Sequence, residues 1–271
     1  MQAPFFASIA QRDSQLRYEF RIFRKSPLMV TPQDANEPGQ PIGVAVPGWI
    51  PPQPPARAAM EGRFCRLEPL DAKAHAESLH AANILNTDGS MWTYMAYGPF
   101  ATLEIYRKWV DGVAGGNDPM FFAIVDRATG KPVGVASYLR VDPANGCIEV
   151  GHLAYSPLLQ RKPAASEAMY LMMAQAFKLG YRRYEWKCNA LNAPSRAAAQ
   201  RLGFSYEGIF RQATVVKGRN RDTAWYSIID AEWPALRGAF ENWLAPANFD
   251  ASGKQRMRLS SLTGPLLQQR G

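Results

Sequence analysis

Short runs after residue 61 either are apolar or alternate hydrophobic with polar residues, and both patterns are typical of strands that bury one or two faces. These runs predict strands over 62–70, 120–126, 132–141, 147–156, 182–188, 204–216 and 223–230. The sequences ATGK and DPANG separate the second, third and fourth runs, and both compositions favour tight turns. Because short turns join antiparallel neighbours, we expect a mostly antiparallel sheet.

Helical signals lie between these strands. Apolar residues at helical spacing predict one long helix over about 164–179. Shorter helices are predicted over 72–82 after the N-cap Asp71, over 103–113 after the N-cap Thr102, and from Pro194 to Gly203. The long helix is a right-handed crossover between two strands, which makes them locally parallel. The fold class is therefore α+β (mixed α/β), with a mostly antiparallel sheet of about six or seven strands, a local parallel βαβ unit and about four helices.

The chain before residue 61 has a different character. Prolines recur between residues 27 and 55, hold the backbone near polyproline geometry and argue against helix or strand there. Residues 16–23 alternate and predict a short strand that adds to a sheet edge or pairs with another subunit. We expect a proline-rich N-terminal arm or linker over 1–60, one folded domain over 61–246 and a C-terminal tail over 247–271.

The formal net charge of +8 narrows the choice of partner. A positive balance fits nucleic acid, an anionic membrane surface or a polyanionic cofactor. The Lys and Arg residues are scattered and form no recognisable nucleic-acid-binding motif, which argues against nucleic acid. No apolar run approaches the ~18 residues of a membrane span, and no basic region precedes the first apolar run as in a secretory signal, so we expect a cytoplasmic protein without a membrane partner. The three cysteines lack metal-ligand spacing, and we expect no metal.

The start of the long helix is the main candidate for a binding site. The strand over 147–156 runs into the loop SPLLQRKPAA and then into this helix. The first four N–H groups of a helix lack partners, and the helix dipole adds about half a positive charge there. Polar and cationic side chains precede the helix, and small residues open it: Gln160, Arg161, Lys162, Ala164, Ala165 and Ser166. This arrangement suits a pyrophosphate.

Two sequence blocks carry a family resemblance. The run from Gln160 to Ala165 resembles the Q/R-x-x-G-x-G/A loop of the GNAT superfamily of N-acetyltransferases. The block NALNAPSRAAAQRLGFSYEG over 189–208 is similar to the N-x-x-S…GF…EG pattern of the RimJ/RimL-type branch, which acts on ribosomal proteins. The resemblance covers about residues 62–232. Pro163 replaces the expected glycine and removes one N–H donor, which implies an altered phosphate grip, although a proline also suits the first position of a helix.

The resemblance implies acetyl-CoA as cosubstrate and a primary amine as acceptor, either a protein N-terminus or a small molecule. The acetyl group would pass by direct attack in a ternary complex. The backbone after Glu149 would bind the pantetheine arm, and one N–H there would polarise the thioester carbonyl. This stretch comprises His152, Leu153, Ala154 and Tyr155. Asn192 would bind the arm from the facing side, or else cap a helix.

Acid and base roles follow from the same resemblance. Glu149 would remove the amine proton through water, with His152 as its rival. The plain alternatives are an ion pair for Glu149 and a packed imidazole for His152. Ser195 would protonate the leaving thiolate, unless it caps a helix instead.

An aromatic segment, MWTYMAYGPF over 91–100, resembles the acceptor side of such sites, together with Trp225 and Tyr226. Core packing is the alternative. Two other functions stay open: a non-catalytic acyl-CoA-binding module, and a basic protein associated with nucleic acid. Whether the chain forms a homodimer is also left open.

Overall fold

The computed structural model describes residues 33–271, which divide after Trp49 into two units, 33–49 and 50–271, each described by itself. In the first unit, β1 (Gln33–Ala35) and β2 (Pro41–Gly43) form an antiparallel pair. Our expectation of no strand between residues 27 and 55 is therefore wrong here. The reason is a local turn, in which the Asn36 side chain bonds Gln40 and Gly39 adopts a φ of 79°. The strand predicted over 16–23 lies outside the described residues.

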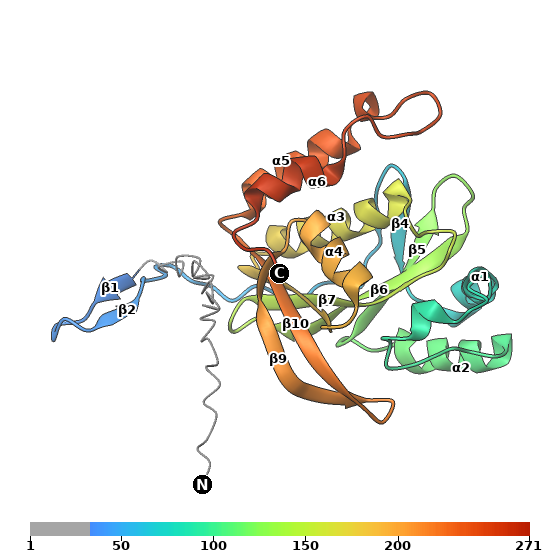
Figure 1. Ribbon diagram of the computed structural model, residues 1–271, viewed down its shortest axis with the longest axis horizontal. Coiled ribbons are helices and arrows are strands. Elements are labelled where there is room, and N and C mark those ends of the chain that lie inside the picture. The colour runs from blue at the N-terminus through green and yellow to red at the C-terminus, as the bar shows by residue number, and fades with distance from the viewer. Residues whose placement is uncertain (1–32) are drawn as a thin grey trace, which may run out of the picture. The chain divides into compact units, whose positions relative to one another are not determined.

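The second unit is built on one eight-stranded sheet with the order β3-β4-β5-β6-β7-β8-β10-β9 (Figure 1). Its strands are β3 (Met60–Glu61), β4 (Cys65–Pro69), β5 (Met120–Asp126), β6 (Pro132–Asp142), β7 (Cys147–Tyr155), β8 (Arg183–Asn189), β9 (Ser205–Val216) and β10 (Arg219–Ile229). Only β7 and β8 pair in parallel. The predicted fold class is confirmed, and the sheet is slightly larger than expected.

Six α-helices are described: α1 (Ala72–Asn83), α2 (Leu103–Ala114), α3 (Pro163–Lys178), α4 (Ala193–Arg201), α5 (Trp233–Leu244) and α6 (Leu259–Thr263). Short 3₁₀ turns add η1 (Ser90–Trp92), η2 (Pro246–Asn248) and η3 (Gly264–Leu266). Asp71 accepts a hydrogen bond from the Ala74 amide, and Thr102 accepts one from the Ile105 amide, which confirms both predicted caps. The sequence patterns did not predict α5 and α6.

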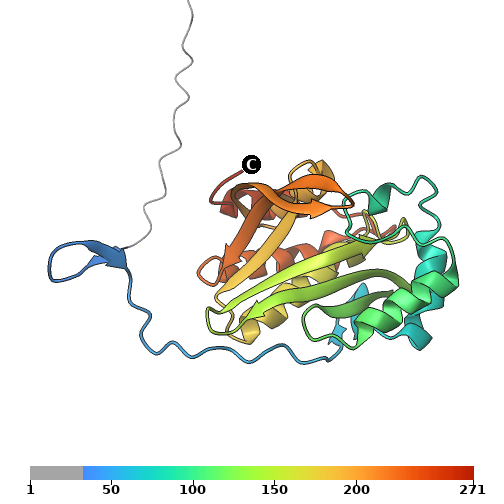
Figure 2. The same cartoon turned by 90° about the horizontal axis from the view of Figure 1, so that it is seen from below.

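The alternation of side chains along the strands gives the sheet two buried faces. On β5, Phe122 and Ile124 join the core under α3, α4 and α5, whereas Phe121 and Ala123 join the core under α1 and α2. Figure 1 shows α3, α4 and α5 on one side of the sheet, and Figure 2 shows α1 and α2 across part of the other. Among residues 33–271, no helix is both long and apolar enough to cross a membrane.

Two contacts hold other parts of the chain against the sheet, one from α3 and one from the C-terminal residues. The buried Glu167 carboxylate on α3 accepts hydrogen bonds from the amides of Arg63, Phe64 and Cys65 at 2.7, 2.6 and 2.8 Å. Because a carboxylate with several N–H donors holds them strongly, this contact ties α3 to the turn before β4. Near the C-terminus, the Tyr206 amide donates to the Gln269 carbonyl at 3.1 Å, so the last residues pack along β9. The predicted boundaries of the domain and its tail stay predictions.

Candidate functional site

The central feature of the site is the point where β7 and β8 part. Their parallel pairing runs from Cys147–Arg183 to Val150–Trp186. Beyond it, β7 continues along β6 as far as the Tyr155–Gly134 pair, and β8 continues along β10 as far as Asn189–Thr223. The facing edges of the two strands are therefore left without each other as partners, and their backbone groups are open to a ligand.

A bulge lies on β7 just past this point. The register with β6 shifts between the Ser137–Gly151 and Val135–Ala154 pairs, so that His152 and Leu153 together face one residue of β6. His152 adopts a φ of 52°, in the left-handed region that non-glycine residues rarely enter. The imidazole packs against Tyr97, in the segment that joins α1 and α2, and against Phe121 on β5.

The surroundings of His152 keep its ring neutral at neutral pH. Nδ1 lies 2.8 Å from the Ser137 hydroxyl, and the ring packs on Tyr97 and Phe121 at 5.9 and 4.9 Å between centroids. Burial, with the nearby Arg140 charge, lowers the pKa of His152 to about 4. A neutral imidazole retains one nitrogen that accepts a proton.

Glu149 lies in a buried ladder of alternating charges. Its carboxylate is 2.6 Å from Arg140 and 3.0 Å from Lys187, and Lys187 in turn contacts Glu185 at 2.8 Å. The Lys187 ammonium lies 3.7 Å from the centre of the Trp225 ring. Burial raises the pKa of Glu149, while Lys187 and Arg140 oppose that rise. The ladder contains the ion pair that was the alternative role predicted for Glu149. It joins β6, β7 and β8 close to the point where β7 and β8 part.

The N-terminus of α4 faces the other side of the opening. Asn192 caps this helix, because its side-chain oxygen accepts the Ser195 amide at 3.1 Å. Ser195 is therefore not the cap. Its hydroxyl accepts the indole N–H of Trp186 at 3.1 Å, which leaves its own proton to be donated. Trp186 belongs to the last parallel pair of β7 and β8, so Ser195 lies at the start of the opening.

The N-terminus of α3 has no side-chain cap. Lys162 occupies the cap position, and Pro163 is the first helical residue, as predicted. The exposed Arg161 has a φ of 62°. Gln160 instead uses its side-chain amide to bond the Tyr155 carbonyl at 2.8 Å. The preceding loop thus closes on the strand and presents its cations outward.

The next three residues, Ala164 to Ser166, are mostly occupied by packing and by hydrogen bonds within the protein. Ala164 and Ala165 have buried side chains, and the Ala165 amide already donates to the Lys162 carbonyl at 3.1 Å. The Ser166 hydroxyl is buried and accepts a hydrogen bond from Arg201 at 2.8 Å. Of this group, the backbone of Ala164 is left to face a ligand directly.

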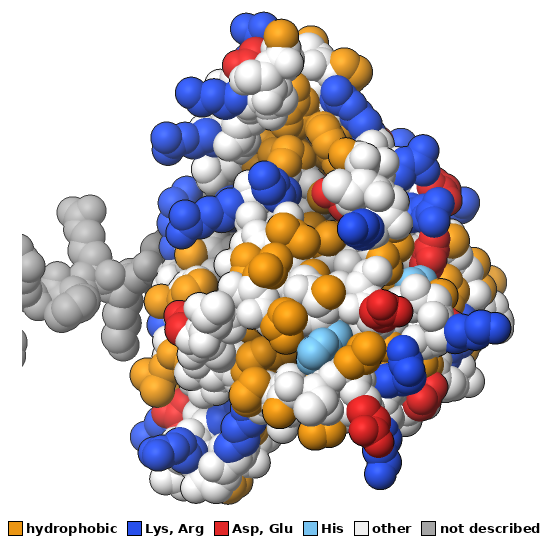
Figure 3. All heavy atoms as spheres, turned by 90° about the vertical axis from the view of Figure 1, so that its right-hand side faces the viewer, with side chains coloured by type: hydrophobic (Ala, Val, Ile, Leu, Met, Phe, Trp, Pro, Cys, Tyr) orange, Lys and Arg blue, Asp and Glu red, His pale blue; other side chains and the backbone are white. Residues whose placement is uncertain are grey.

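Two contacts hold the aromatic segment 91–100 over the site. The Tyr94 hydroxyl donates to the Leu191 carbonyl at 3.1 Å, beside Asn192. The Lys217 ammonium, at the tip of the β9–β10 hairpin, donates to the carbonyls of Trp92 and Gly98 at 3.1 and 2.9 Å. Figure 3 shows hydrophobic side chains gathered across the middle of the α1–α2 end of the molecule, with Lys and Arg side chains mostly toward its edge.

Two expected tyrosines do not present their hydroxyls to the opening. Tyr226 is fully buried in the core under the helices, and its hydroxyl accepts a hydrogen bond from Arg196 at 3.2 Å. Burial raises the pKa of Tyr155, whose hydroxyl is buried without a partner among the described residues. Tyr155 therefore contributes its backbone only.

Sequence reasoning missed the partners of the expected residues: Ser137 for His152, Trp186 for Ser195 and Lys187 for Glu149. One signal was present. Arg183, Glu185 and Lys187 alternate in charge with a period of two, which indicates one charged face of a strand beside Glu149. The Ser137 and Trp186 contacts depend on strand register and had no local signal.

Comparisons with known proteins agree on one family. A family model described as an acetyltransferase (GNAT) domain matches residues 65–205. The crystal structure of a GCN5-related N-acetyltransferase from Brucella melitensis is 48% identical, with a TM-score of 0.79, over 81% of this chain and 100% of that one. A probable acetyltransferase of the GNAT family from Chromobacterium violaceum is 38% identical, with a TM-score of 0.67, over 72% of this chain and 98% of that one.

More distant relatives add less. An uncharacterized N-acetyltransferase, p20 of Bacillus licheniformis, is 27% identical over 154 residues, which is 54% of this chain and 84% of that protein. Two solved structures at 23% identity share the fold alone. They are the microcin C7 self-immunity acetyltransferase MccE in complex with acetyl-CoA and AMP, with a TM-score of 0.55 over 62% of this chain and 93% of that one, and the ribosomal L7/L12 acetyltransferase RimL, with a TM-score of 0.54 over 62% and 91%.

Proposed function

Because the chain belongs to the acetyltransferase (GNAT) family, we propose that it is an N-acetyltransferase that uses acetyl-CoA to acetylate a primary amine. The observation that carries this proposal is the parting of β7 and β8 after the Val150–Trp186 pair. It leaves two open backbone edges between the neutral His152 imidazole and the Ser195 hydroxyl, which accepts the Trp186 indole N–H and neighbours the Cys188 sulfur. A slot of this kind suits an extended amide-containing arm, because such an arm needs backbone partners along its length.

The residues present fit the cosubstrate. The uncapped N-terminus of α3 and the exposed Arg161 and Lys162 would hold the pyrophosphate, with Gln160 fixing the loop. The backbone of Leu153, Ala154 and Tyr155 would bind the pantetheine arm on one side. The Asn192 amide nitrogen would bind it on the other, because the Asn192 oxygen is already used in capping α4. Pro163 has no N–H, and the Ala165 N–H already donates to the Lys162 carbonyl, so fewer backbone donors remain for the phosphates. This supports phosphate contacts that differ from those of the family loop.

Acetyl-CoA supplies the activated acetyl thioester, and the chain's own groups handle the protons. We assign proton removal from the amine to His152, because its ring is neutral at neutral pH and stacks on Tyr97 of the acceptor-side segment. A pKa of about 4 makes this imidazole a weak base, so it would take the proton as the attacking nitrogen gains positive charge rather than from a free ammonium. Glu149 stays the alternative base, but its carboxylate is bonded to two cations, which makes it a better anchor for the strands than a proton acceptor. An N–H within residues 152–155 would polarise the carbonyl.

We assign proton donation to the departing sulfur to Ser195. Its oxygen accepts the Trp186 indole N–H, so its own O–H, which neighbours the Cys188 sulfur, is the group that would turn to the thiolate. A serine hydroxyl is a weak acid, and its contribution lies in orienting a hydrogen bond to the thiolate as charge develops. This places acid and base on opposite sides of the opening between β7 and β8.

The acceptor is proposed to be a protein N-terminus or a small amine. The segment 189–208 favours a RimJ/RimL-type enzyme, and the aromatic segment 91–100 supplies a hydrophobic wall on the acceptor side. The Tyr94 and Lys217 hydrogen bonds hold this segment in place and so limit the space beside it, which favours an acceptor with a narrow chain. A cytoplasmic location stays a prediction, and the oligomeric state stays open.

A thiol-release assay tests this function. Acetyl-CoA is mixed with the full chain and a panel of peptides that differ in their first residue, beside small amines, and mass spectrometry checks each product for one added acetyl group. The matched control is the same peptide with a blocked N-terminus. Amine-dependent thiol release supports the proposal. Binding of acetyl-CoA with no release across the panel would instead support a non-catalytic acyl-CoA-binding module.

A further inference from the structure

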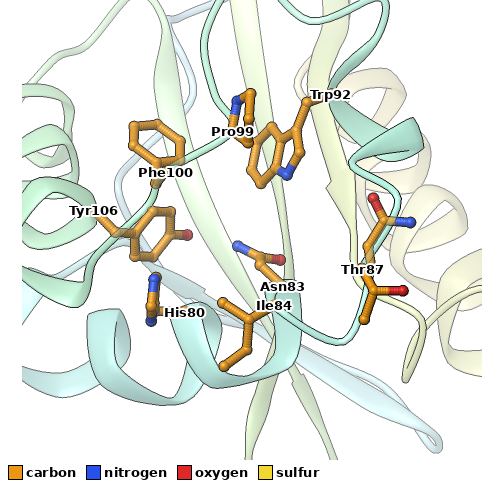
Figure 4. Close-up of a pocket in the computed structure, with 9 residues that line it drawn as sticks. His80, Asn83, Ile84, Thr87, Trp92, Pro99, Phe100 and Tyr106 are labelled. Atoms are coloured by element: carbon orange, nitrogen blue, oxygen red, sulfur yellow. The ribbon is translucent and has the colours of Figure 1, made fainter.

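A cavity of about 190 Å³ lies between α1, α2 and the segment that joins them, away from the opening between β7 and β8. Figure 4 shows its nine lining residues, and all of them fall between positions 80 and 106. None comes from β7, β8, α3 or α4. The cavity is therefore separate from the proposed cosubstrate site, although Trp92, Pro99 and Phe100 on its wall belong to the aromatic segment 91–100 proposed as the acceptor wall. Trp92 and Phe100 also pack against Tyr97, the ring that stacks on His152.

The walls of this cavity are firmly held. Trp92 is 5% exposed and Tyr106 is 1% exposed, and the Trp92 and Phe100 rings pack edge to face at 5.4 Å. Gly98 has a φ of 67°, and a Cβ at this position would lie 2.5 Å from the Trp92 ring, so only glycine lets the segment close on the indole. Lys217 holds the carbonyls of Trp92 and Gly98 from outside. Because its walls are fixed, the cavity keeps its shape without a ligand and can accept one without rearrangement.

Two polar atoms of the lining residues have no hydrogen-bond partner in the described part of the chain. They are Nε2 of His80 and the side-chain oxygen of Asn83, and Asn83 is only 6% exposed. Figure 4 shows the Asn83 amide pointing into the space between Trp92 and Tyr106. The other end of this amide bonds the Tyr106 hydroxyl. Buried polar atoms are normally paired, so an unpaired acceptor that points into a cavity indicates a missing donor.

The lining also restricts the chemistry of the ligand. It contains no Lys, Arg, Asp or Glu, and a charged ligand would lose its hydration here without compensation. Trp92, Phe100 and Tyr106 offer aromatic surface, which favours a flat ring. A cavity of roughly 150 Å³ holds one benzene molecule, so the volume here admits one ring with a small substituent.

We propose that this cavity binds an uncharged six-membered aromatic ring that carries a primary carboxamide. The carboxamide N–H donates to the Asn83 oxygen, which lies between Trp92 and Tyr106. A primary carboxamide supplies this donor without adding a charge to the cavity. The inference does not rest on acetyl transfer and stands or falls apart from it.

The test uses the full chain and three probes: benzamide, benzoate and benzene. Calorimetry should show benzamide bound one to one and at least about tenfold more tightly than benzoate or benzene, equivalent to about 1.4 kcal/mol. Asn83→Leu keeps the size and removes the oxygen, and should weaken benzamide about tenfold while leaving benzene unchanged. Asn145→Leu, the same change in an exposed turn outside the cavity, should alter neither.

A second measurement covers the case in which Asn83→Leu does not fold. In the unaltered chain, nuclear Overhauser effects should connect the benzamide ring protons to the Trp92 indole. Absence of benzamide binding at about 10 mM, a concentration at which even weak ligands bind, would overturn the proposal. Equal affinity for the three probes would also overturn it, as would unchanged benzamide binding in folded Asn83→Leu.

Discussion

Acid should destabilise the folded chain through His152. Burial, with Arg140 nearby, lowers the pKa of His152 from 6.5 to about 4. Below about pH 6.5 the unfolded chain therefore binds a proton at His152, whereas the folded chain does not until the pH approaches 4. Because the unfolded state binds more protons in this window, stability is complete above it and is lost as the pH falls through it.

The structure sets the size of this effect. One pKa unit corresponds to about 1.4 kcal/mol, so the shift from 6.5 to about 4 limits the loss to about 3 kcal/mol. Between about pH 7.5 and about pH 4.5 we expect most of that loss, about 2.5 kcal/mol. The variant His152→Gln removes the titration. Its lost packing on Tyr97 and Phe121 shifts the stability by the same amount at every pH.

Urea unfolding of both proteins across this pH range supplies the measurement. The free energy of unfolding of the unaltered chain minus that of His152→Gln should fall by about 2.5 kcal/mol from the neutral to the acid end. Titration of the imidazole ring protons by nuclear magnetic resonance gives the same pKa independently. A difference that stays constant with pH would show that folded His152 titrates at its ordinary pKa, and would refute the assignment of a neutral buried ring.

Three further outcomes are expected. Replacing both Arg161 and Lys162 with alanine should weaken acetyl-CoA binding about tenfold or more by calorimetry and leave pantetheine unaffected, whereas Lys178→Ala at the other end of α3 should change neither. Lys217→Met removes the two hydrogen bonds from Lys217 to the aromatic segment and should raise the KM for the amine about tenfold, with the affinity for acetyl-CoA unchanged. An equal change in both quantities would contradict a role of these bonds in amine binding. Deleting residues 1–49 should leave one cooperative thermal transition, because residues 50–271 form their own compact unit, and loss of that transition would show that the deleted part completes the core.

Local sequence signals predicted much of the fold. The caps Asp71 and Thr102 act within three residues of themselves, and the apolar run over 120–126 matches β5 in full. Helix α5 was not predicted, although its segment carries a local signal: Trp233, Leu236, Phe240 and Trp243 recur at helical spacing. In the fold, this face packs against a distant helix, where Trp233 stacks on Phe177 and Phe240 stacks on Tyr170.

The position of the candidate site in the fold was predictable, whereas the roles of its residues stay predictions. The order of strand, loop and helix predicted the loop before α3, and the prediction that Pro163 opens the helix is confirmed. The charge state of His152 depends on burial by the distant Tyr97 and Phe121, and the proton direction of Ser195 depends on Trp186 in another strand. These properties arise from register and packing, so the structure was needed to assign them.

The most direct test of the account is the rate of amine-dependent thiol release at about pH 7.5 for the unaltered chain and for His152→Gln, measured with the best amine of the panel. If His152 removes the amine proton within the opening between β7 and β8, the variant should lose roughly 10²–10⁴-fold in turnover. Its calorimetric affinity for acetyl-CoA should stay within about twofold, since the cosubstrate is held by other groups. Full turnover in the variant, or a rate of thiol release that does not depend on the amine concentration, would contradict the account.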